Sequence, residues 1–164
     1  MFTGDSSGAF LMRALHKAGF ANQPTSDHAR DGLALAGAYI TATVRCAPPA
    51  NKPTPIEIGR CQPYLEAELA LLRDVSVIVA LGRVAFEASW RVLVRLGAPG
   101  RPKPVFAHGL SYDFEGLPTL IASYHPSRQN TNTGRLTELM LDQVFATARH
   151  LLVAGNAGSP HSEG

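Results

Sequence analysis

Residues 75–97 read VSVIVALGRVAFEASWRVLVRLG, and this stretch decides the expected fold. Its first part, residues 75–81, is an almost unbroken apolar run, which is typical of a strand buried on both faces of a parallel sheet. The rest, residues 82–97, opens at Gly82 and predicts a helix. A buried strand that passes directly into a helix is the repeating unit of α/β proteins, so the stretch predicts that fold class.

The rest of the chain repeats this alternation of strands and helices. The predicted helices cover residues 8–20, 56–74, 82–97 and 135–155, and the predicted strands lie near residues 38–44, 75–81 and 119–124. Residues 105–119 predict one more short strand and a turn. The alternation predicts a three-layer α/β/α arrangement, with a short central parallel sheet and helices on both of its faces.

The composition is that of one ordinary globular domain. The chain has 164 residues, of which 45% are hydrophobic and 17% charged. Its net charge of +2 is too weak to indicate nucleic-acid binding by itself. No apolar run is long enough to span a bilayer and the start does not resemble a signal peptide, so we expect a cytoplasmic protein that does not contact membranes. We predict one domain over residues 1–153 and a disordered tail over residues 154–164.

Polar segments follow two of the three predicted strands. Residues 45–53 read RCAPPANKP, and residues 125–134 read HPSRQNTNTG, whereas the strand over residues 75–81 is followed only by Gly82 and Arg83. Ligands of open α/β sheets bind beyond the carboxyl ends of the strands, so both segments are expected to form one site. Gly82 is expected to make a tight strand-to-helix turn, with a phosphate bound by its N–H as the alternative.

His125 is the most informative single residue of these segments. Pro126 restricts the residue before it to extended conformations, so His125 is expected to project from the end of its strand. There an imidazole can donate a hydrogen bond to a developing negative charge or move a proton near neutral pH. The alternative is a histidine bound to a neighbouring backbone group. The run from Arg128 to Thr131 favours a functional site, because it offers contacts to phosphates and base edges and could form a wedge.

Four segments together resemble a known family. They are FTGDSSGAFL (2–11), VRCAPPANKPTP (44–55), VALGRVAFEA (79–88) and SYHPSRQNTNTGRLTE (123–138). In order and spacing they closely resemble the type 5 uracil-DNA glycosylases, over roughly residues 1–153. The resemblance implies a monomeric DNA-repair enzyme with the uracil-DNA glycosylase-like α/β/α fold. Such an enzyme flips uracil or another deaminated base out of double- or single-stranded DNA and hydrolyses its N-glycosidic bond.

The resemblance also implies roles for particular residues. Asp5 matches the catalytic aspartate that stabilises the sugar cation or orients water, and His125 matches the histidine that faces the base carbonyl. Asn51 matches an asparagine that holds water or substrate, and Phe2 matches the aromatic ring beside the flipped base. At Ala42, related families place an asparagine that reads the uracil edge, so this pocket is expected to discriminate less between bases. The expected DNA contacts are Ser127, Arg128, Gln129, Asn130, Thr131 and Arg135.

Each of these residues also has a simpler interpretation. Asp5 could be the N-cap of the first helix, and Asn51 among prolines could form an Asx turn. Phe2 could be a core ring or part of a frayed terminus. Arg128 could be a solvated surface charge.

Cys46 and Cys61 match two of the four ligands of a 4Fe–4S cluster that some members of the family carry. A cubane cluster usually takes four thiolates, and the family's other two belong to an amino-terminal Cys-x-x-Cys pair that this sequence lacks. Met1 aligns inside the family's first active-site motif, so the resemblance implies an amino-terminally incomplete domain with its first strand missing. A vacant strand position and an apolar edge prone to aggregation are then expected.

Three functions therefore stay open at this point. The first is a uracil-DNA glycosylase of broad specificity. The second is a DNA-binding remnant of that fold without catalytic activity. The third is an unrelated α/β domain in which both cysteines are buried thiols.

Overall fold

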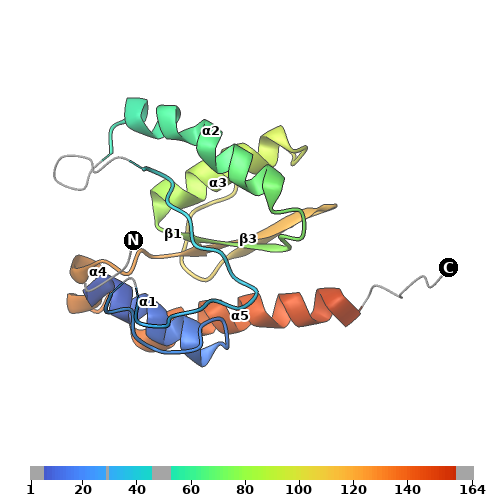
Figure 1. The fold of residues 1–164 in the computed structure, drawn as a ribbon. Coiled ribbons are helices and arrows are strands. Elements are labelled where there is room, and N and C mark those ends of the chain that lie inside the picture. Colours follow the sequence, from blue (N-terminus) through green and yellow to red (C-terminus); the bar gives the residue numbers. More distant parts are fainter. Residues whose placement is uncertain (1–5, 29, 46–52, 158–164) are drawn as a thin grey trace.

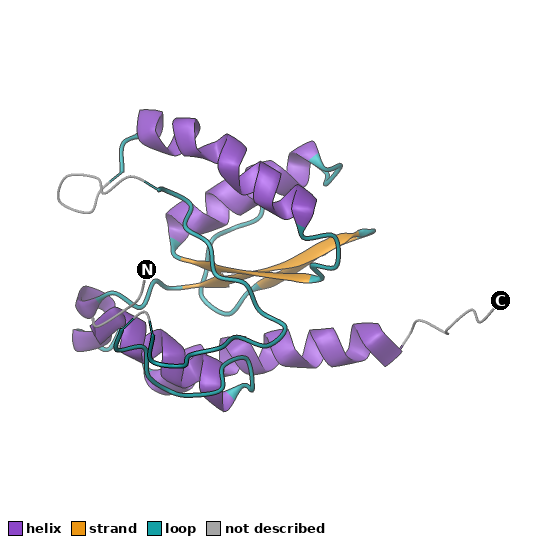
Figure 2. Ribbon diagram, in the orientation of Figure 1, coloured by secondary structure: helices purple, strands orange, loops and turns teal. Residues whose placement is uncertain are grey.

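The computed structural model describes residues 6–28, 30–45 and 53–157, and it places a small sheet between two layers of helices. The elements are α1 (Ser6–Lys17), α2 (Pro55–Leu71), β1 (Val77–Leu81), α3 (Arg83–Arg95), β2 (Ser111–Phe114), β3 (Leu117–Ser123), α4 (Arg128–Asn132) and α5 (Glu138–Ala157). Helices α2 and α3 lie on one side of the sheet, and α1 and α5 lie on the other (Figures 1 and 2). The predicted α/β/α architecture is confirmed.

The sheet has the strand order β1-β3-β2. Strands β1 and β3 are parallel, with Val77 opposite Thr119 and Leu81 opposite Ser123. Two of the predicted strands are thus confirmed. The additional short strand predicted within residues 105–119 forms as β2, and it pairs with β3 in the antiparallel direction. The chain reverses between them at Gly116, whose φ of 70° lies in the left-handed region, and such a short hairpin makes neighbouring strands antiparallel.

The predicted strand over residues 38–44 is also wrong. These residues form no strand, and within the described part of the chain β1 pairs with β3 alone. Residues 37–44 and β1 line a common cavity of about 1900 Å³, which we call the large cavity. A strand needs a second backbone about 5 Å away. The β-forming side chains of this segment had suggested a strand, but no described backbone pairs with it.

Side chains on α2 hold residues 39–45 in place instead. The Tyr39 hydroxyl donates to Glu68 Oε1 at 3.1 Å, and Thr41 and Arg45 also bind the Glu68 carboxylate. Burial raises the pKa of Glu68, but the hydrogen bonds from Thr41 and Tyr39 and the charge of Arg45 outweigh it, so the pKa is lowered. An ionised Glu68 therefore anchors the segment that leads into residues 46–52.

The two faces of β3 carry two separate clusters of the core. Ile121 packs with Leu11, Met12 and Leu15 of α1 and with Leu141 and Val144 of α5. Leu120 and Ala122 point the other way and pack with Phe86, Trp90 and Leu93 of α3. All three β3 side chains are completely buried. Neighbouring side chains of a strand face opposite sides of the sheet, so β3 joins both helical layers to one sheet.

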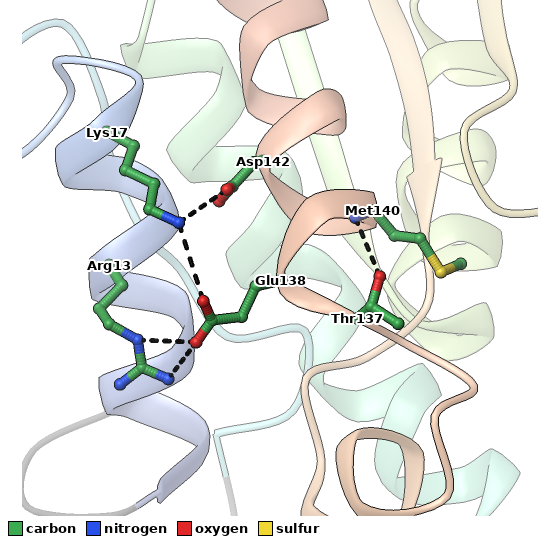
Figure 3. A network of polar contacts seen from close by, with 6 residues as sticks. All are labelled: Arg13, Lys17, Thr137, Glu138, Met140 and Asp142. Carbon is green, nitrogen blue, oxygen red and sulfur yellow. Dashed lines mark hydrogen bonds and ion pairs between the residues drawn. The ribbon is translucent and has the colours of Figure 1, made fainter.

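A network of charges joins α1 to the start of α5 (Figure 3). Arg13 contacts Glu138 at 3.0 Å, and Lys17 contacts Asp142 at 2.8 Å. The hydrogen bond to Asp142 raises the pKa of Lys17, so the ammonium stays charged. Helix α1 directly follows Asp5 in the sequence, and α5 follows the segment that begins at His125. The network therefore holds together the two helices that adjoin these predicted catalytic residues.

The four predicted helices all form, with modest shifts at their ends. Helix α2 begins with a capping box, in which the Thr54 hydroxyl accepts from the Glu57 N–H and the Glu57 carboxylate accepts from the Thr54 N–H. Helix α5 extends to Ala157, so residues 154–157 are helical and the predicted tail cannot begin before residue 158. None of the helices in the described ranges combines the length and apolarity needed to cross a membrane.

Candidate functional site

The segment after β3 folds into a short capped helix, α4, which the sequence had not predicted. Ser127 has an extended backbone, and its hydroxyl accepts a hydrogen bond from the Asn130 N–H at 3.4 Å. Serine is a favoured N-cap, and its position directly before residues 128–132 is the signal that sequence reasoning missed. The result is a defined protrusion at the carboxyl end of β3.

This protrusion divides the predicted DNA contacts into two groups. The Asn130 amide donates to the His125 carbonyl at 2.9 Å, and the Thr131 hydroxyl donates to the Ser127 carbonyl at 3.2 Å. The side chains of Arg128 and Gln129 are exposed. Asn130 and Thr131 therefore maintain the shape of the segment, whereas Arg128 and Gln129 face outward, where a ligand can reach them.

His125 lies exposed two residues beyond β3, at the border of two cavities. Pro126, which follows it, is fully buried and anchors the turn. His125 shares the large cavity with Ser7 of α1 and Ala42 of the 37–44 segment. Three segments distant in sequence thus meet at one cavity, and each of them carries or flanks a predicted site residue.

Gly82 supports His125 from the neighbouring strand. Its N–H donates to the Ser123 carbonyl at 2.7 Å, so the alternative in which this N–H binds a DNA phosphate is wrong. Gly82 has φ 95° and ψ 161°, a conformation essentially restricted to glycine. A Cβ atom on this residue would lie 3.2 Å from the Cβ of His125. Glycine is therefore required by both the backbone and the packing.

Gly82→Ala should displace His125 and destabilise the domain. The backbone conformation alone should lower the free energy of unfolding by about 1–3 kcal/mol. Urea denaturation would measure this loss, and the His125 NMR signals would report the displacement. Gly59→Ala is the matched control, because a Cβ at Gly59 meets no atom within 4 Å. Unchanged stability and unchanged His125 signals in Gly82→Ala would contradict this account.

His108 is a supporting residue that no sequence pattern indicated. Its Nδ1 accepts a hydrogen bond from the Tyr124 N–H at 3.1 Å, and its ring stacks on the Tyr124 ring with centroids 5.1 Å apart. Burial lowers the pKa of His108, and a hydrogen bond with the Met140 backbone opposes that shift only partly. A neutral His108 with an accepting Nδ1 therefore fixes the residue that precedes His125.

The lowered pKa of His108 predicts a loss of stability in acid. The unfolded chain takes up a proton on this residue as the pH falls through 6.5, whereas the folded protein resists it. The free energy of unfolding should therefore decline as the pH falls below that value. His108→Asn keeps an acceptor at the Nδ1 position without titrating, so its stability should decline less. Denaturation at about pH 7.5 and about pH 5.5 compares the two proteins, and equal declines would contradict the assignment.

Several predicted site residues lie outside the described residues, namely Phe2, Asp5, Cys46 and Asn51. Their neighbours Ser7 and Val44 both line the large cavity, which His125 also lines. The convergence of Asp5, Asn51 and His125 on one cleft stays a prediction, and so does the proximity of the two cysteines.

The described residues contain one cysteine, Cys61, which is buried in α2 with 4% of its surface exposed. No group of three or more potential metal ligands occurs within the described ranges. A cubane cluster takes four thiolates, and this sequence has two cysteines. The residues of this chain alone therefore do not fit a complete 4Fe–4S site.

Comparison with known proteins gives consistent matches. The profile of the Uracil DNA glycosylase superfamily matches residues 1–149. The Type-5 uracil-DNA glycosylase of Thermus thermophilus is 51% identical over 150 residues, which are 92% of this chain and 66% of that protein. The protein of the same name from Mycobacterium tuberculosis is 51% identical over 153 residues, or 92% of this chain and 56% of that protein. The chain thus spans between about half and two thirds of the length of these relatives.

Proposed function

Because this chain belongs to the uracil-DNA glycosylase superfamily, we propose that it serves DNA repair by hydrolysing the N-glycosidic bond of uracil in DNA. The structural observation that carries the proposal is the capped segment after β3. It presents Arg128 and Gln129 outward beside His125, at the mouth of a cavity large enough for an extruded base. The family match rules out the unrelated α/β domain as a candidate.

The proposed reaction requires groups on both sides of the bond that breaks. As the bond stretches, the sugar gains positive charge and the departing base gains negative charge. We assign the sugar side to the carboxylate of Asp5, which directly precedes α1, with Asn51 holding water or substrate. His125 donates to the base carbonyl, and Phe2 lies against the flipped ring. The bond breaks between the base and the sugar C1′, water supplies the hydroxyl at C1′, and the base leaves with a proton.

The base pocket is proposed to accept more than uracil. Ala42 lines the large cavity, and its methyl group offers no hydrogen bond to a base edge. Strong rejection of a wrong base requires a polar group that the wrong base leaves unpaired. The alanine therefore supports a broader range of deaminated bases.

We propose that Cys46 and Cys61 supply two of the four thiolates of a 4Fe–4S cluster, and no step of base release uses it. The other two thiolates would have to come from outside the 164 residues of this sequence. We further propose that the protein acts as a cytoplasmic monomer on both double- and single-stranded DNA.

Uracil release from matched single- and double-stranded oligonucleotides tests the proposed function. An exposed wedge assists extrusion from a duplex, whereas a single-stranded base needs little help. Arg128→Ala and Gln129→Ala should therefore slow release from duplex DNA about tenfold, which corresponds to about 1.4 kcal/mol of lost transition-state stabilisation, and leave single strands nearly unaffected.

Thr147→Ala on α5 is a control, because the Thr147 hydroxyl donates to the Gln143 carbonyl of the same helix and Thr147 lines neither cavity. Equal losses on both substrates would show that the segment grips phosphates without separating bases. DNA binding without any release of uracil would favour the alternative, a DNA-binding remnant of the fold.

A further inference from the structure

A second, smaller pocket lies on the other side of His125. Its volume is about 280 Å³, and its lining includes Arg83, Phe106, Tyr124, Asn130 and Arg135. We call it the arginine pocket. Arg83 is the first residue of α3, and Arg135 follows α4, so residues distant in sequence meet here. The family resemblance had implied that Arg135 contacts DNA, but nothing in the sequence had indicated Arg83 or Phe106.

Each arginine of this pocket lies over an aromatic ring. The Arg83 Cζ is 5.0 Å from the Phe106 centroid, and the Arg135 Cζ is 4.8 Å from the Tyr124 centroid. The two rings also contact each other, with centroids 6.1 Å apart. A cation–π contact holds the guanidinium over the face of the ring, while its N–H groups stay available for hydrogen bonds at its edge. The paired rings therefore orient two guanidinium groups toward one pocket.

The charges of these two arginines are not neutralised within the described residues. Arg13, Arg45 and Arg95 each form an ion pair, but Arg83 and Arg135 have no described carboxylate within 4.0 Å. The described lining of the arginine pocket contains two arginines and one histidine, and none of its residues is acidic. An oriented pair of guanidinium groups that has no counter-ion among the described residues is suited to an external anion.

We propose that the arginine pocket binds a single phosphate of the DNA backbone, held by Arg83 and Arg135 together. This proposal rests on the proposed function. A phosphodiester accepts several hydrogen bonds in the fork geometry that guanidinium groups provide. A volume of about 280 Å³ is at the low end for a ligand site, which suits a phosphate better than a whole nucleotide. Because His125 borders both cavities, the phosphate would be next to the extruded nucleotide.

The dependence of DNA binding on salt tests whether the two arginines share one phosphate. Affinity of the full chain for a duplex with a tetrahydrofuran abasic site would be measured by fluorescence anisotropy. Each neutralised phosphate contributes about 0.9 to the slope of log K against log salt concentration. Arg83→Ala, Arg135→Ala and the double variant should each lose roughly one such contribution, with about tenfold weaker binding at moderate salt.

A loss of roughly two contributions in the double variant would overturn a shared phosphate, and so would no loss. Arg101→Ala is the charge-matched control, because Arg101 is exposed and lines neither cavity. Arg83→Lys and Arg135→Lys should keep the slope but bind more weakly, since an ammonium cannot form the forked contact.

Methylphosphonate substitution then locates the phosphate. A neutral linkage at one position next to the lesion should weaken binding of the parent protein about tenfold, and it should not weaken the double variant further. Equal effects at every position, or an undiminished effect in the double variant, would overturn the proposal.

A titration with inorganic phosphate tests the arginine pocket independently of the proposed function. The Nε–H NMR signals of Arg83 and Arg135 should shift and saturate with phosphate. Saturation in a chain that releases no uracil would overturn the proposed function alone. Release of uracil with DNA binding indifferent to both arginines would overturn the pocket alone. If the signals saturate with phosphate but a methylphosphonate has the same effect on DNA affinity at every position, the pocket binds free anions. That result would overturn the assignment to a DNA phosphate.

Discussion

Asp5→Asn should lower the rate of uracil release by about 10²–10³-fold while DNA binding stays nearly unchanged. The substitution keeps the size of the side chain but removes the negative charge that would face the sugar cation. Charge that develops only in the transition state affects the rate more than ground-state binding. Single-turnover release from uracil-containing DNA and the affinity for an abasic-site duplex would measure the two effects separately.

The same substitution distinguishes catalysis from helix capping. Helix α1 begins at Ser6, so Asp5 is placed in the sequence where an N-cap is expected. Asparagine caps helices about as well as aspartate does, whereas alanine does not. If Asp5 is only a cap, Asp5→Asn should release uracil at the parental rate, and only Asp5→Ala should lose stability. That outcome would refute the proposed role of the carboxylate.

His125→Ala should also slow base release by about 10²–10³-fold, because the departing base loses the hydrogen-bond donor that stabilises its charge. The loss should depend on the substrate. A base that leaves easily needs less stabilisation, so 5-fluorouracil should be released with a smaller loss than uracil. Single-turnover rates for both bases, measured on single-stranded DNA, would separate this chemical effect from base extrusion.

His150→Ala is the matched control for that experiment, since His150 is exposed on α5, away from both cavities. His125→Gln keeps an N–H donor and should recover part of the rate. Losses that are equal for uracil and 5-fluorouracil would mean that His125 supports the shape of the segment and does not stabilise the leaving base.

The sequence by itself determined the strands and helices that are encoded by a local pattern of apolar residues. The apolar runs at 75–81 and 119–124 became β1 and β3, because a continuous apolar stretch is stable only between two covered faces. The predicted helices formed with ends set by local signals, such as the capping box at Thr54 and the left-handed Gly19 after α1. The prominence of His125 and of the segment after it also came from composition alone.

Only the tertiary structure decided what depends on contacts between distant residues. Residues 38–44 have strand-forming side chains, but a strand also needs a neighbouring backbone, and here Glu68 on α2 holds the segment instead. The sequence could not show that the Asn130 amide binds the His125 carbonyl and that Arg128 remains outside. Nor could it show that Arg83 and Arg135 meet, since their shared pocket depends on two aromatic rings from other segments. Such contacts arise from the packing of helices and strands, and no local sequence pattern encodes them.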